Sequence, residues 1–455
     1  MSPEAYEEAL AHTNTYSRPS QLRITDIRIA NMGAHGWRRP LIKIMTNQGL
    51  EGYGEVRDGA SKTYALMLKS RLLGENPCDV DRLFRRIKQF GYHGRQAGGV
   101  CGIEVALWDL AGKAYGVPVY QMLGGKFRDR IRIYCDTDVR GKDTGLAMGQ
   151  ALKKRMEMGF TFLKMDVGIN LLAGVEGALT APLGFLEEMR NAVRNPSTDL
   201  PDLERRRLRN RWYDLNNIAH PFTGIRITEK GLDYLEAYVA EVRSIIGYDI
   251  PLATDHFGHI GLEDCIKIAQ RLDPYNLAWY EDMLPWQYTD QYVRLYQACK
   301  TPLCTGEDIY LKENFRPLLE ARAVSVIHPD ILSCGGILEL KKIGDMAQEY
   351  GVAMAIHMAE SPIACMAAVH AAAATENFYV LENHSVDDPK WNLIVHGLPN
   401  PIIQQGFIQV PEGPGLGITA LNDEVIAEYL DPNDPDLWSP TEAWDHEFSH
   451  DRLWS

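Results

Sequence analysis

Ile250-Pro251-Leu252-Ala253-Thr254-Asp255 is a short apolar run that ends on a carboxylate. Similar runs follow it along the chain, and a chemically active polar residue stands at or just after the end of each. These residues are Asp255, Glu281, Glu307, Asp330, His357 and Glu382. Successive members are about 25 residues apart, which is close to the length of one strand followed by one helix. The pattern predicts parallel βα units of a TIM-type barrel, with the six side chains at the carboxyl ends of its strands.

The first part of the chain has a different pattern. Residues 23–29 alternate between polar and apolar side chains as a strand does. Residues 41–46 and 51–55 predict two strands around a turn at Asn47-Gln48-Gly49. Residues 61–121 have a mostly helical periodicity. Strands followed by helices predict a small α+β domain over about the first 125 residues.

Composition and charge exclude several classes of partner. The chain has 455 residues, of which 45% are hydrophobic and 24% are charged, as in an ordinary soluble protein. Its formal net charge of -14 argues against nucleic acids and anionic membranes, because both bind basic patches. A small anionic substrate stays compatible with this charge, since a bound divalent cation reverses the local field.

No segment has the character of a targeting or membrane-spanning sequence. Residues 1–20 are polar and predict a flexible leader without a signal core. The most apolar stretch, residues 352–374, contains His357 and Glu360 and is therefore not expected to cross a membrane. The eight cysteines include no Cys-x-x-Cys pair, which favours reduced thiols. Together these features predict a cytoplasmic protein.

Three of the strand-end residues form the ligand set expected for a hard cation. Asp255, Glu281 and Glu307 follow successive strands and offer only oxygen atoms, which suits Mg²⁺ and leaves positions for water and substrate. Three carboxylates that converge without a cation would repel one another. A single residue of this kind is more often a helix cap or a salt-bridge partner, but a regular series of them favours the metal site.

The next two residues predict a general base. His357 follows one apolar strand and Asp330 ends the strand before it. An aspartate that accepts a proton from one imidazole nitrogen fixes the tautomer and leaves the other nitrogen to remove a proton from a substrate. We therefore interpret Asp330 and His357 as a catalytic pair.

Several longer motifs resemble a known family. The chain is similar, over about residues 22–430, to the mandelate racemase / muconate lactonizing enzyme branch of the enolase superfamily, and within it to the sugar acid dehydratases. The motifs are Thr305-Gly306-Glu307, Tyr280-Glu281-Asp282, residues 329–337, residues 357–362, residues 102–113 and Leu123-Gly124-Gly125.

The resemblance implies an α/β fold, namely a TIM-type (β/α)7β barrel with an N-terminal α+β capping domain. It also implies Mg²⁺ on Asp255, Glu281 and Glu307, the Asp330–His357 pair as base, and Glu382 as the group that hydrogen-bonds the substrate carboxylate. The expected divisions are a leader at 1–20, a capping domain at 21–128, a barrel at 129–385 with an insertion at about 170–224, and a segment at 386–455 that returns to the capping domain and ends in an aromatic, acidic tail.

The chain departs from the family pattern after the strand at Phe162-Leu163. The family's racemases have Lys-x-Lys there, and their second lysine is a base, whereas this chain has Lys164-Met165-Asp166. Racemisation by two bases is therefore less favoured. Lys164 is a candidate to bind the substrate. Asp166 is a candidate partner for it, or alternatively a helix cap at the end of the strand.

A second departure concerns the general acid. Residues 255–259 read Asp-His-Phe-Gly-His, and Phe257 occupies the position where related dehydratases can hold an acid. His256 and His259 are the candidates to protonate the departing hydroxyl group. Strand alternation would turn His256 away from Asp255 unless the loop bends, so both histidines stay open.

Specificity in this family is usually set by loops of the capping domain. The candidates are His35 and Arg38 in the loop at 31–39, and Arg57 after the third strand. The alternative for each is a surface position without substrate contact. The basic run at 204–207 in the insertion is interpreted as a solvated helix face.

These observations predict an enzyme of carbohydrate acid catabolism. The leading hypothesis is a Mg²⁺-dependent hydro-lyase that dehydrates an aldonate or aldarate to a 2-keto-3-deoxy acid through an enediolate. The alternative is an epimerase, racemase or cycloisomerase on a related hydroxy acid, and a minor alternative is a non-catalytic sugar acid binding protein. The expected partners are a small carboxylate and further copies of the chain in a homo-oligomer, with no nucleic acid and no membrane.

Overall fold

A computed structural model of the chain describes residues 2, 17–34, 38–138, 140–181, 188, 192, 196–216, 224–255 and 260–448. The chain divides into two compact units. Unit 1 consists of residues 1–135, 306–316 and 327–455, and unit 2 of residues 136–305 and 317–326. The domain boundaries expected from the sequence stay a prediction.

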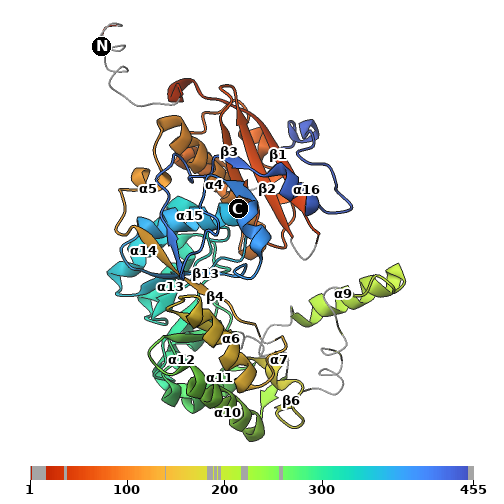
Figure 1. The fold of residues 1–455 in the computed structure, drawn as a ribbon, viewed down its shortest axis with the longest axis vertical. Coiled ribbons are helices and arrows are strands. Elements are labelled where there is room, and N and C mark those ends of the chain that lie inside the picture. The colour runs from red at the N-terminus through yellow and green to blue at the C-terminus, as the bar shows by residue number, and fades with distance from the viewer. Residues whose placement is uncertain are drawn as a thin grey trace. The chain divides into compact units, whose positions relative to one another are not determined.

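Unit 1 begins with an antiparallel sheet in the order β1-β2-β3 (Figure 1). Its strands are β1 (Ile24–Met32), β2 (Arg39–Thr46) and β3 (Glu51–Glu55). Helix α4 (Gly94–Tyr115) packs against β3, and glycines allow this close approach. A Cβ atom added to Gly54 would lie 2.0 Å from the carbonyl oxygen of Gly102 on α4. Gly116, with φ of 72°, is the C-cap residue of α4.

Parallel strands form the second part of unit 1. They follow the order β15-β4-β13-β12-β11, in which β15 pairs antiparallel with β4. Glu382 on β13 lies opposite Tyr134 on β4. The elements are β4 (Arg130–Cys135), β11 (Val326–Ile327), β12 (Ala353–Ile356), β13 (Phe378–Asn383), β15 (Phe407–Gln409), α14 (Ile337–Glu349) and α15 (Pro362–Ala373).

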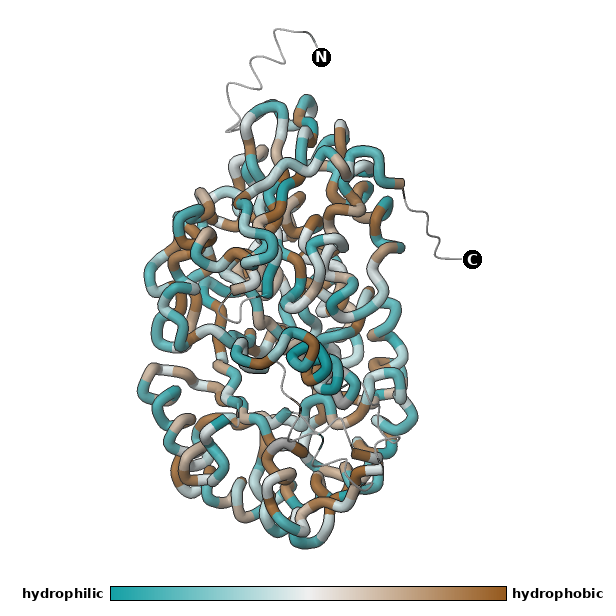
Figure 2. Tube along the Cα trace, turned by 90° about the vertical axis from the view of Figure 1, so that its right-hand side faces the viewer, coloured by the Kyte–Doolittle hydropathy of each residue, from teal (hydrophilic) through white to brown (hydrophobic). Residues whose placement is uncertain are grey.

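Helix α15 is the most deeply buried helix among the described residues of unit 1, since every one of its residues is buried. It is the apolar stretch noted in the sequence, and alanine dominates it because close neighbours leave little room for side chains. Chain positions with brown and teal colours are interleaved along the rest of the trace, as expected for elements with one buried face (Figure 2). None of the described helices is long and apolar enough to span a membrane.

The end of the chain lies along β1. Leu430 forms an isolated bridge with Met32, and the hydroxyl group of Thr441 donates a hydrogen bond of 2.6 Å to the carbonyl of Ile27. Lys69 forms a 2.6 Å ion pair with Asp445. The remaining elements of unit 1 are η1 (Pro19–Gln21), α2 (Thr63–Leu66), η2 (Lys69–Arg71), α3 (Val80–Ile87), η3 (Lys88–Phe90), α5 (Val119–Met122), η5 (Pro389–Leu393), β14 (Val395–His396), β16 (Ala420–Leu421), α16 (Asp423–Glu428) and η6 (Glu442–Trp444).

Unit 2 contains parallel strands in the order β10-β9-β8-β5, with helices between them along the chain. Asp166 on β5 lies opposite Asp255 on β8. The elements are β5 (Leu163–Asp166), β8 (Leu252–Asp255), β9 (Tyr280–Glu281), β10 (Leu303–Thr305), α6 (Gly145–Glu157), α7 (Ile169–Leu172), α10 (Glu229–Ile246), α11 (Leu262–Leu272), η4 (Asp273–Tyr275) and α12 (Thr289–Ala298). Helix α13 (Lys312–Glu320) lies where the chain passes between the units.

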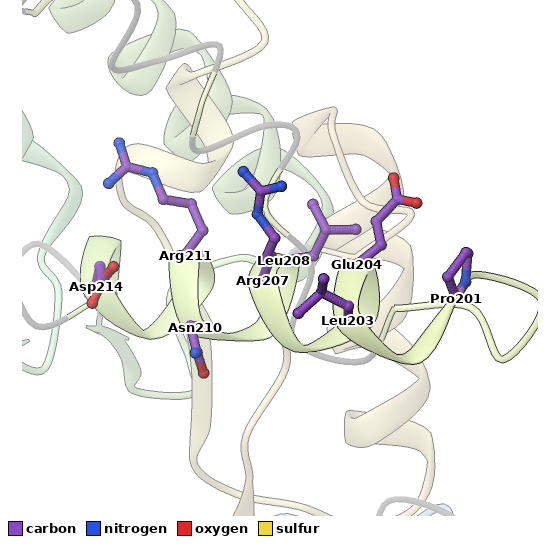
Figure 3. Close-up of a pocket in the computed structure, with 8 residues that line it drawn as sticks. All are labelled: Pro201, Leu203, Glu204, Arg207, Leu208, Asn210, Arg211 and Asp214. Atoms are coloured by element: carbon purple, nitrogen blue, oxygen red, sulfur yellow. The ribbon is translucent and has the colours of Figure 1, made fainter.

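The expected insertion contains β6 (Leu179–Thr180), which pairs with β7 (Arg226–Ile227), and helix α9 (Asp202–Asn216). The basic run lies on α9, where Arg206 and Arg207 are exposed. A surface depression runs along this helix (Figure 3), and its lining residues all come from α9 and the adjacent Pro201. Because no other described element closes it, the depression is a face of one helix rather than an enclosed site.

Candidate active site

In unit 2, a buried lysine holds two of the predicted metal ligands together. Lys164 on β5 donates hydrogen bonds of 2.9 Å to Asp255 Oδ2 and of 2.9 Å to Glu281 Oε1. The exposed fractions of the three residues are 1%, 5% and 0%. They stand on the neighbouring strands β5, β8 and β9, as the alternating pattern predicts. Lys164 therefore lies within 4 Å of carboxylates from two other strands.

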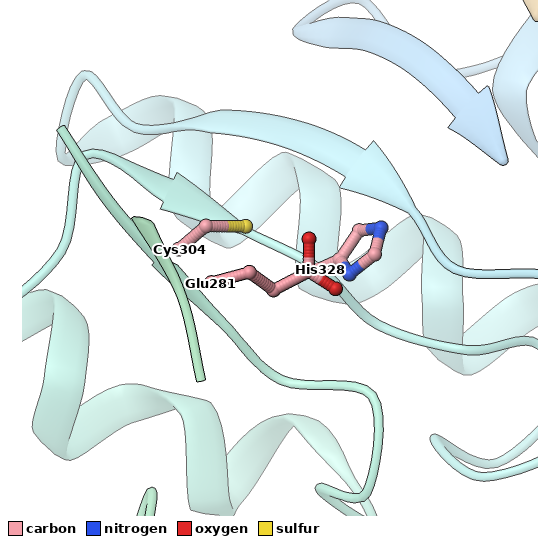
Figure 4. Close-up of side chains that lie close together, drawn as sticks. All are labelled: Glu281, Cys304 and His328. Carbon is pink, nitrogen blue, oxygen red and sulfur yellow. The ribbon is translucent and has the colours of Figure 1, made fainter. Parts of the chain in front are cut away.

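Two neighbours of Glu281 are the indole nitrogen of Trp279 and the cysteine that pairs with it on the next strand. The indole nitrogen of Trp279 donates a hydrogen bond of 2.9 Å to Glu281 Oε2. Cys304 pairs in register with Glu281 on the next strand, β10, and both side chains are drawn in Figure 4. Asp255 and Glu281 both direct a carboxylate oxygen at one cationic group, and oxygen is the ligand type that Mg²⁺ prefers.

Asp166 is buried at the end of β5. Its exposed fraction is 8%, and its backbone nitrogen donates to the carbonyl of Thr137 at 3.1 Å. The following helix, α7, has Gly168 as its N-cap residue and no side-chain capping bond. Asp166 itself stands two residues before this N-cap, so the helix-cap alternative stays a prediction. Its role in binding or catalysis stays a prediction.

In unit 1, the predicted pair of Asp330 and His357 is in contact. His357 Nδ1 lies 2.6 Å from Asp330 Oδ2. Asp330 Oδ1 accepts a hydrogen bond of 2.6 Å from the backbone nitrogen of Leu332. Asp330 is fully buried and His357 is 5% exposed. The carboxylate is thus fixed from both sides, and the imidazole keeps Nε2 for a second partner.

That second nitrogen lies among further carboxylates. His357 Nε2 is 3.3 Å from Glu307 Oε2 and 3.9 Å from Glu382 Oε2. Burial alone would lower the pKa of His357, but the charge of Glu307 and the bond to Asp330 outweigh it and hold the pKa well above its ordinary value. Glu307, predicted as a metal ligand, therefore stands directly beside the predicted base.

Glu382 is surrounded by histidines, two of which the sequence prediction missed. It is fully buried at the end of β13. His384 Nε2 lies 3.3 Å from Glu382 Oε1, and His328 Nε2 lies 3.6 Å from Glu382 Oε2. The hydroxyl of Tyr134 is 3.0 Å from His328 Nε2, and Figure 4 also labels His328. Both histidines could have been found from the sequence, because each stands two residues from a predicted site residue and strand alternation turns such residues to the same side.

Arg57, predicted to bind substrate, is enclosed by the protein's own carboxylates. It is fully buried, and its guanidinium group lies 3.1 Å from Asp330 Oδ2 and 3.3 Å from Glu360 Oε1. It also donates to the carbonyl of Glu307 at 3.1 Å. Burial alone would lower its pKa, but the charges of Asp330 and Glu360 hold it well above its ordinary value. The chain itself thus supplies the anions that this arginine binds.

Of the other residues predicted to contact the substrate or act as the general acid, the structure describes Arg38. Arg38 is half-buried, and its carbonyl accepts a hydrogen bond of 2.7 Å from Gly59. His35, His256 and His259 lie outside the described residues. The roles of these four residues stay predictions.

Two buried glutamates of unit 1 bind the starts of helices. Glu55, at the end of β3, accepts a backbone hydrogen bond of 3.1 Å from Ser361, which caps α15. Glu104, on α4, accepts hydrogen bonds of 2.7 Å and 3.1 Å from the first residues of α14, Ile337 and Leu338. Burial raises the pKa of each to about 8. These carboxylates attach the β1–β3 sheet and α4 to the helices that frame the Asp330–His357 pair.

The chain matches two family models over most of its length. Residues 147–425 match the enolase C-terminal domain-like model, and residues 12–124 match the N-terminal domain model of mandelate racemase / muconate lactonizing enzyme.

Named relatives and solved structures agree with these matches. A D-xylonate dehydratase from Haloferax volcanii is 30% identical over 434 residues, which cover 93% of each chain. A D-galactonate dehydratase from Ralstonia pickettii is 27% identical and covers 89% of this chain and 94% of its own. A mandelate racemase/muconate lactonizing enzyme-like protein from Rubrobacter xylanophilus is similar in structure, with a TM-score of 0.74, 29% identity and coverage of 91% of this chain and 99% of its own.

Proposed function

Because the chain belongs to the mandelate racemase / muconate lactonizing enzyme family of the enolase superfamily, we propose that it is a hydro-lyase that removes water from a sugar acid. The observation that carries the proposal is the buried contact of 2.6 Å between Asp330 and His357. A base held in this way suits removal of the proton next to a carboxylate. Relatives named as dehydratases of D-xylonate and D-galactonate support an aldonate as substrate.

The proposed cation is Mg²⁺ on Asp255, Glu281 and Glu307. Its fit rests on the oxygen-only ligand set and on the two buried carboxylates that already converge on Lys164. Held by these three carboxylates, Mg²⁺ would supply positive charge next to the substrate carboxylate and would reduce the attraction between Glu307 and the proton of His357.

The protein's own groups carry the remaining steps of the proposal. Asp330 holds a proton on Nδ1 of His357, so that Nε2 accepts the α-proton of the substrate. Glu382 hydrogen-bonds the substrate carboxylate. Arg57 holds Asp330 in place through an ion pair of 3.1 Å. Loss of the β-hydroxyl group then gives an enol, which becomes a 2-keto-3-deoxy acid.

The structure favours dehydration over epimerisation, the second candidate. An epimerase needs a second base on the opposite face of the α-carbon, and Lys164 was the candidate for it. Its ammonium group donates to two carboxylates at 2.9 Å each, and both are proposed metal ligands. His357, by contrast, is paired with Asp330, and a single base on one face suits a lyase.

The test is to incubate the protein with Mg²⁺ in D₂O with D-xylonate, D-galactonate and a wider set of mono- and diacids, and to follow products by NMR. We expect a 2-keto-3-deoxy acid from at least one aldonate, abolished by His357→Asn or by a chelator. Deuterium at the α-carbon without loss of water would instead support the epimerase. Absence of both reactions in protein that binds Mg²⁺ would support a sugar acid binding protein.

We further propose that the protein acts on this small carboxylate as a homo-oligomer. The family expectation supports the oligomer, and the net charge of -14 disfavours nucleic acids as partners. Light scattering of the purified chain measures its mass in solution, and a monomer would contradict it.

A further inference from the structure

His384 is a third imidazole beside the proposed base. It follows β13 and stands two residues after Glu382, so strand alternation turns both side chains to the same side. Its Nε2 lies 3.3 Å from Glu382 Oε1. Its ring centroid is 5.6 Å from that of His357. One ring nitrogen of His357, one ring nitrogen of His384 and one carboxylate oxygen of Glu382 all lie within 4.8 Å of one another.

Exposure distinguishes His384 from its neighbours. Its side chain is 33% exposed, whereas those of His357 and Glu382 are 6% and 0% exposed. A ligand that reaches His357 therefore also meets His384. In the described part of the chain, the other histidine near Glu382 is His328, which is fully buried and in contact with Tyr134.

The distance between the rings of His357 and His384 suits action on two adjacent carbons of one substrate. A general acid or base acts at about 2.6–3.2 Å from the atom that it protonates or deprotonates. With ring centroids 5.6 Å apart, the two imidazoles can reach the α-proton and the oxygen on the adjacent β-carbon from the same side. Glu382 lies beside both imidazoles, with its oxygens 3.9 Å from His357 Nε2 and 3.3 Å from His384 Nε2.

We propose that His384 is the general acid that protonates the departing β-hydroxyl group, an inference that rests on the proposed dehydration. His357 takes the α-proton, and the electron pair of that C–H bond forms the carbon–carbon double bond. The bond between the β-carbon and oxygen breaks, and its electron pair leaves with the oxygen, which takes a proton from His384 and departs as water. His384 ends neutral and His357 ends protonated, and exchange with solvent restores both. Because acid and base act from one side, the elimination is syn.

The experiment separates proton removal from loss of water. In D₂O, the His384→Gln variant should still exchange the α-proton of the substrate at a rate near that of the wild type. Formation of 2-keto acid should fall by about 10²–10⁴-fold, the usual contribution of a general acid. A substrate with fluoride in place of the β-hydroxyl group needs little protonation, so the variant should eliminate fluoride nearly as fast as the wild type.

A matched control is His396→Gln, which changes an exposed histidine on β14 of the same unit and should leave both reactions unchanged. Dehydration by His384→Gln at the wild-type rate would overturn the proposal. Equal loss of exchange, dehydration and fluoride elimination would also overturn it. His384 would then only shape the site or bind the substrate, without donating a proton. Normal dehydration by His384→Gln, with a selective defect in His256→Gln or His259→Gln, would place the acid at 256–259. Wild-type protein without exchange or product would contradict the dehydratase function itself.

Discussion

Replacing Arg57 by methionine tests whether this buried guanidinium group holds the site together. Methionine has a similar length and no charge, so Asp330 and Glu360 lose a cation at 3.1 Å and 3.3 Å while both stay fully buried. Breaking a buried ion pair in this way costs about 3–5 kcal/mol. We expect the free energy of unfolding to fall by that amount, measured by urea unfolding with circular dichroism and tryptophan fluorescence.

The pH dependence of the stability loss in Arg57→Met gives a second test of the same reasoning. Burial, together with the charge of Asp330, already raises the pKa of Glu360 to about 7, although Arg57 lowers it. Without Arg57 this pKa rises further above its unfolded value, so the folded variant binds more protons than the unfolded chain. Stability of the variant should therefore recover as the pH falls from above about 7 towards 4.5, the ordinary pKa of a glutamate. Adding Glu360→Gln should restore part of the loss at the higher pH.

The control is Arg82→Met in the same unit. Arg82 also contacts two carboxylates, of Glu75 and Asp79, at 2.6 Å and 2.9 Å, but its side chain is 48% exposed. Exposed pairs contribute little to stability, so this variant should unfold like the wild type. Unfolding of Arg57→Met that matches Arg82→Met at every pH would refute the reasoning.

Three further changes test other parts of the structure. Lys164→Met removes the ammonium group that competes with a cation for two carboxylates, so calorimetry should show tighter Mg²⁺ binding and the metal-free protein should be less stable. Glu104, with its pKa raised to about 8 by burial, should make the wild type lose stability as pH rises from about 4.5 to about 8, and urea unfolding of Glu104→Gln should lack that slope. Gly54→Ala puts a Cβ atom 2.0 Å from the carbonyl oxygen of Gly102, so thermal melting should show a loss of several degrees or failure to fold, whereas Ala at the exposed Gly49 is expected to cost less.

The regular spacing of polar strand ends predicted much of the architecture. The strands that end at Asp166, Asp255 and Glu281 are present with those residues as their last members. The comparisons confirm the expected family and its fold, a cap domain with a barrel-like domain of curled parallel sheet. Local periodicity suffices for these features because strand alternation and unit length depend on neighbouring residues.

The contacts of Arg57 and His384 could not be predicted in the same way. Arg57 lies in a loop, and its partners Asp330 and Glu360 are far away in the sequence, so its direction depends on long-range packing. The motif around His357 drew attention to Glu360 but not to its partner. His384 stands just beyond a strand, where alternation was a usable signal. The roles proposed for the site residues stay predictions until they are tested.

The bridge between Met32 and Leu430, with the bond from Thr441 to Ile27, has a consequence for synthesis on the ribosome. The edge of β1 is synthesised about 400 residues before the segment that pairs with it. Unpaired strand edges attract other chains, so the nascent protein carries an adhesive edge throughout elongation. Chains that stop before Leu430 should aggregate or bind chaperones, although every predicted metal ligand and the Asp330–His357 pair have already been translated.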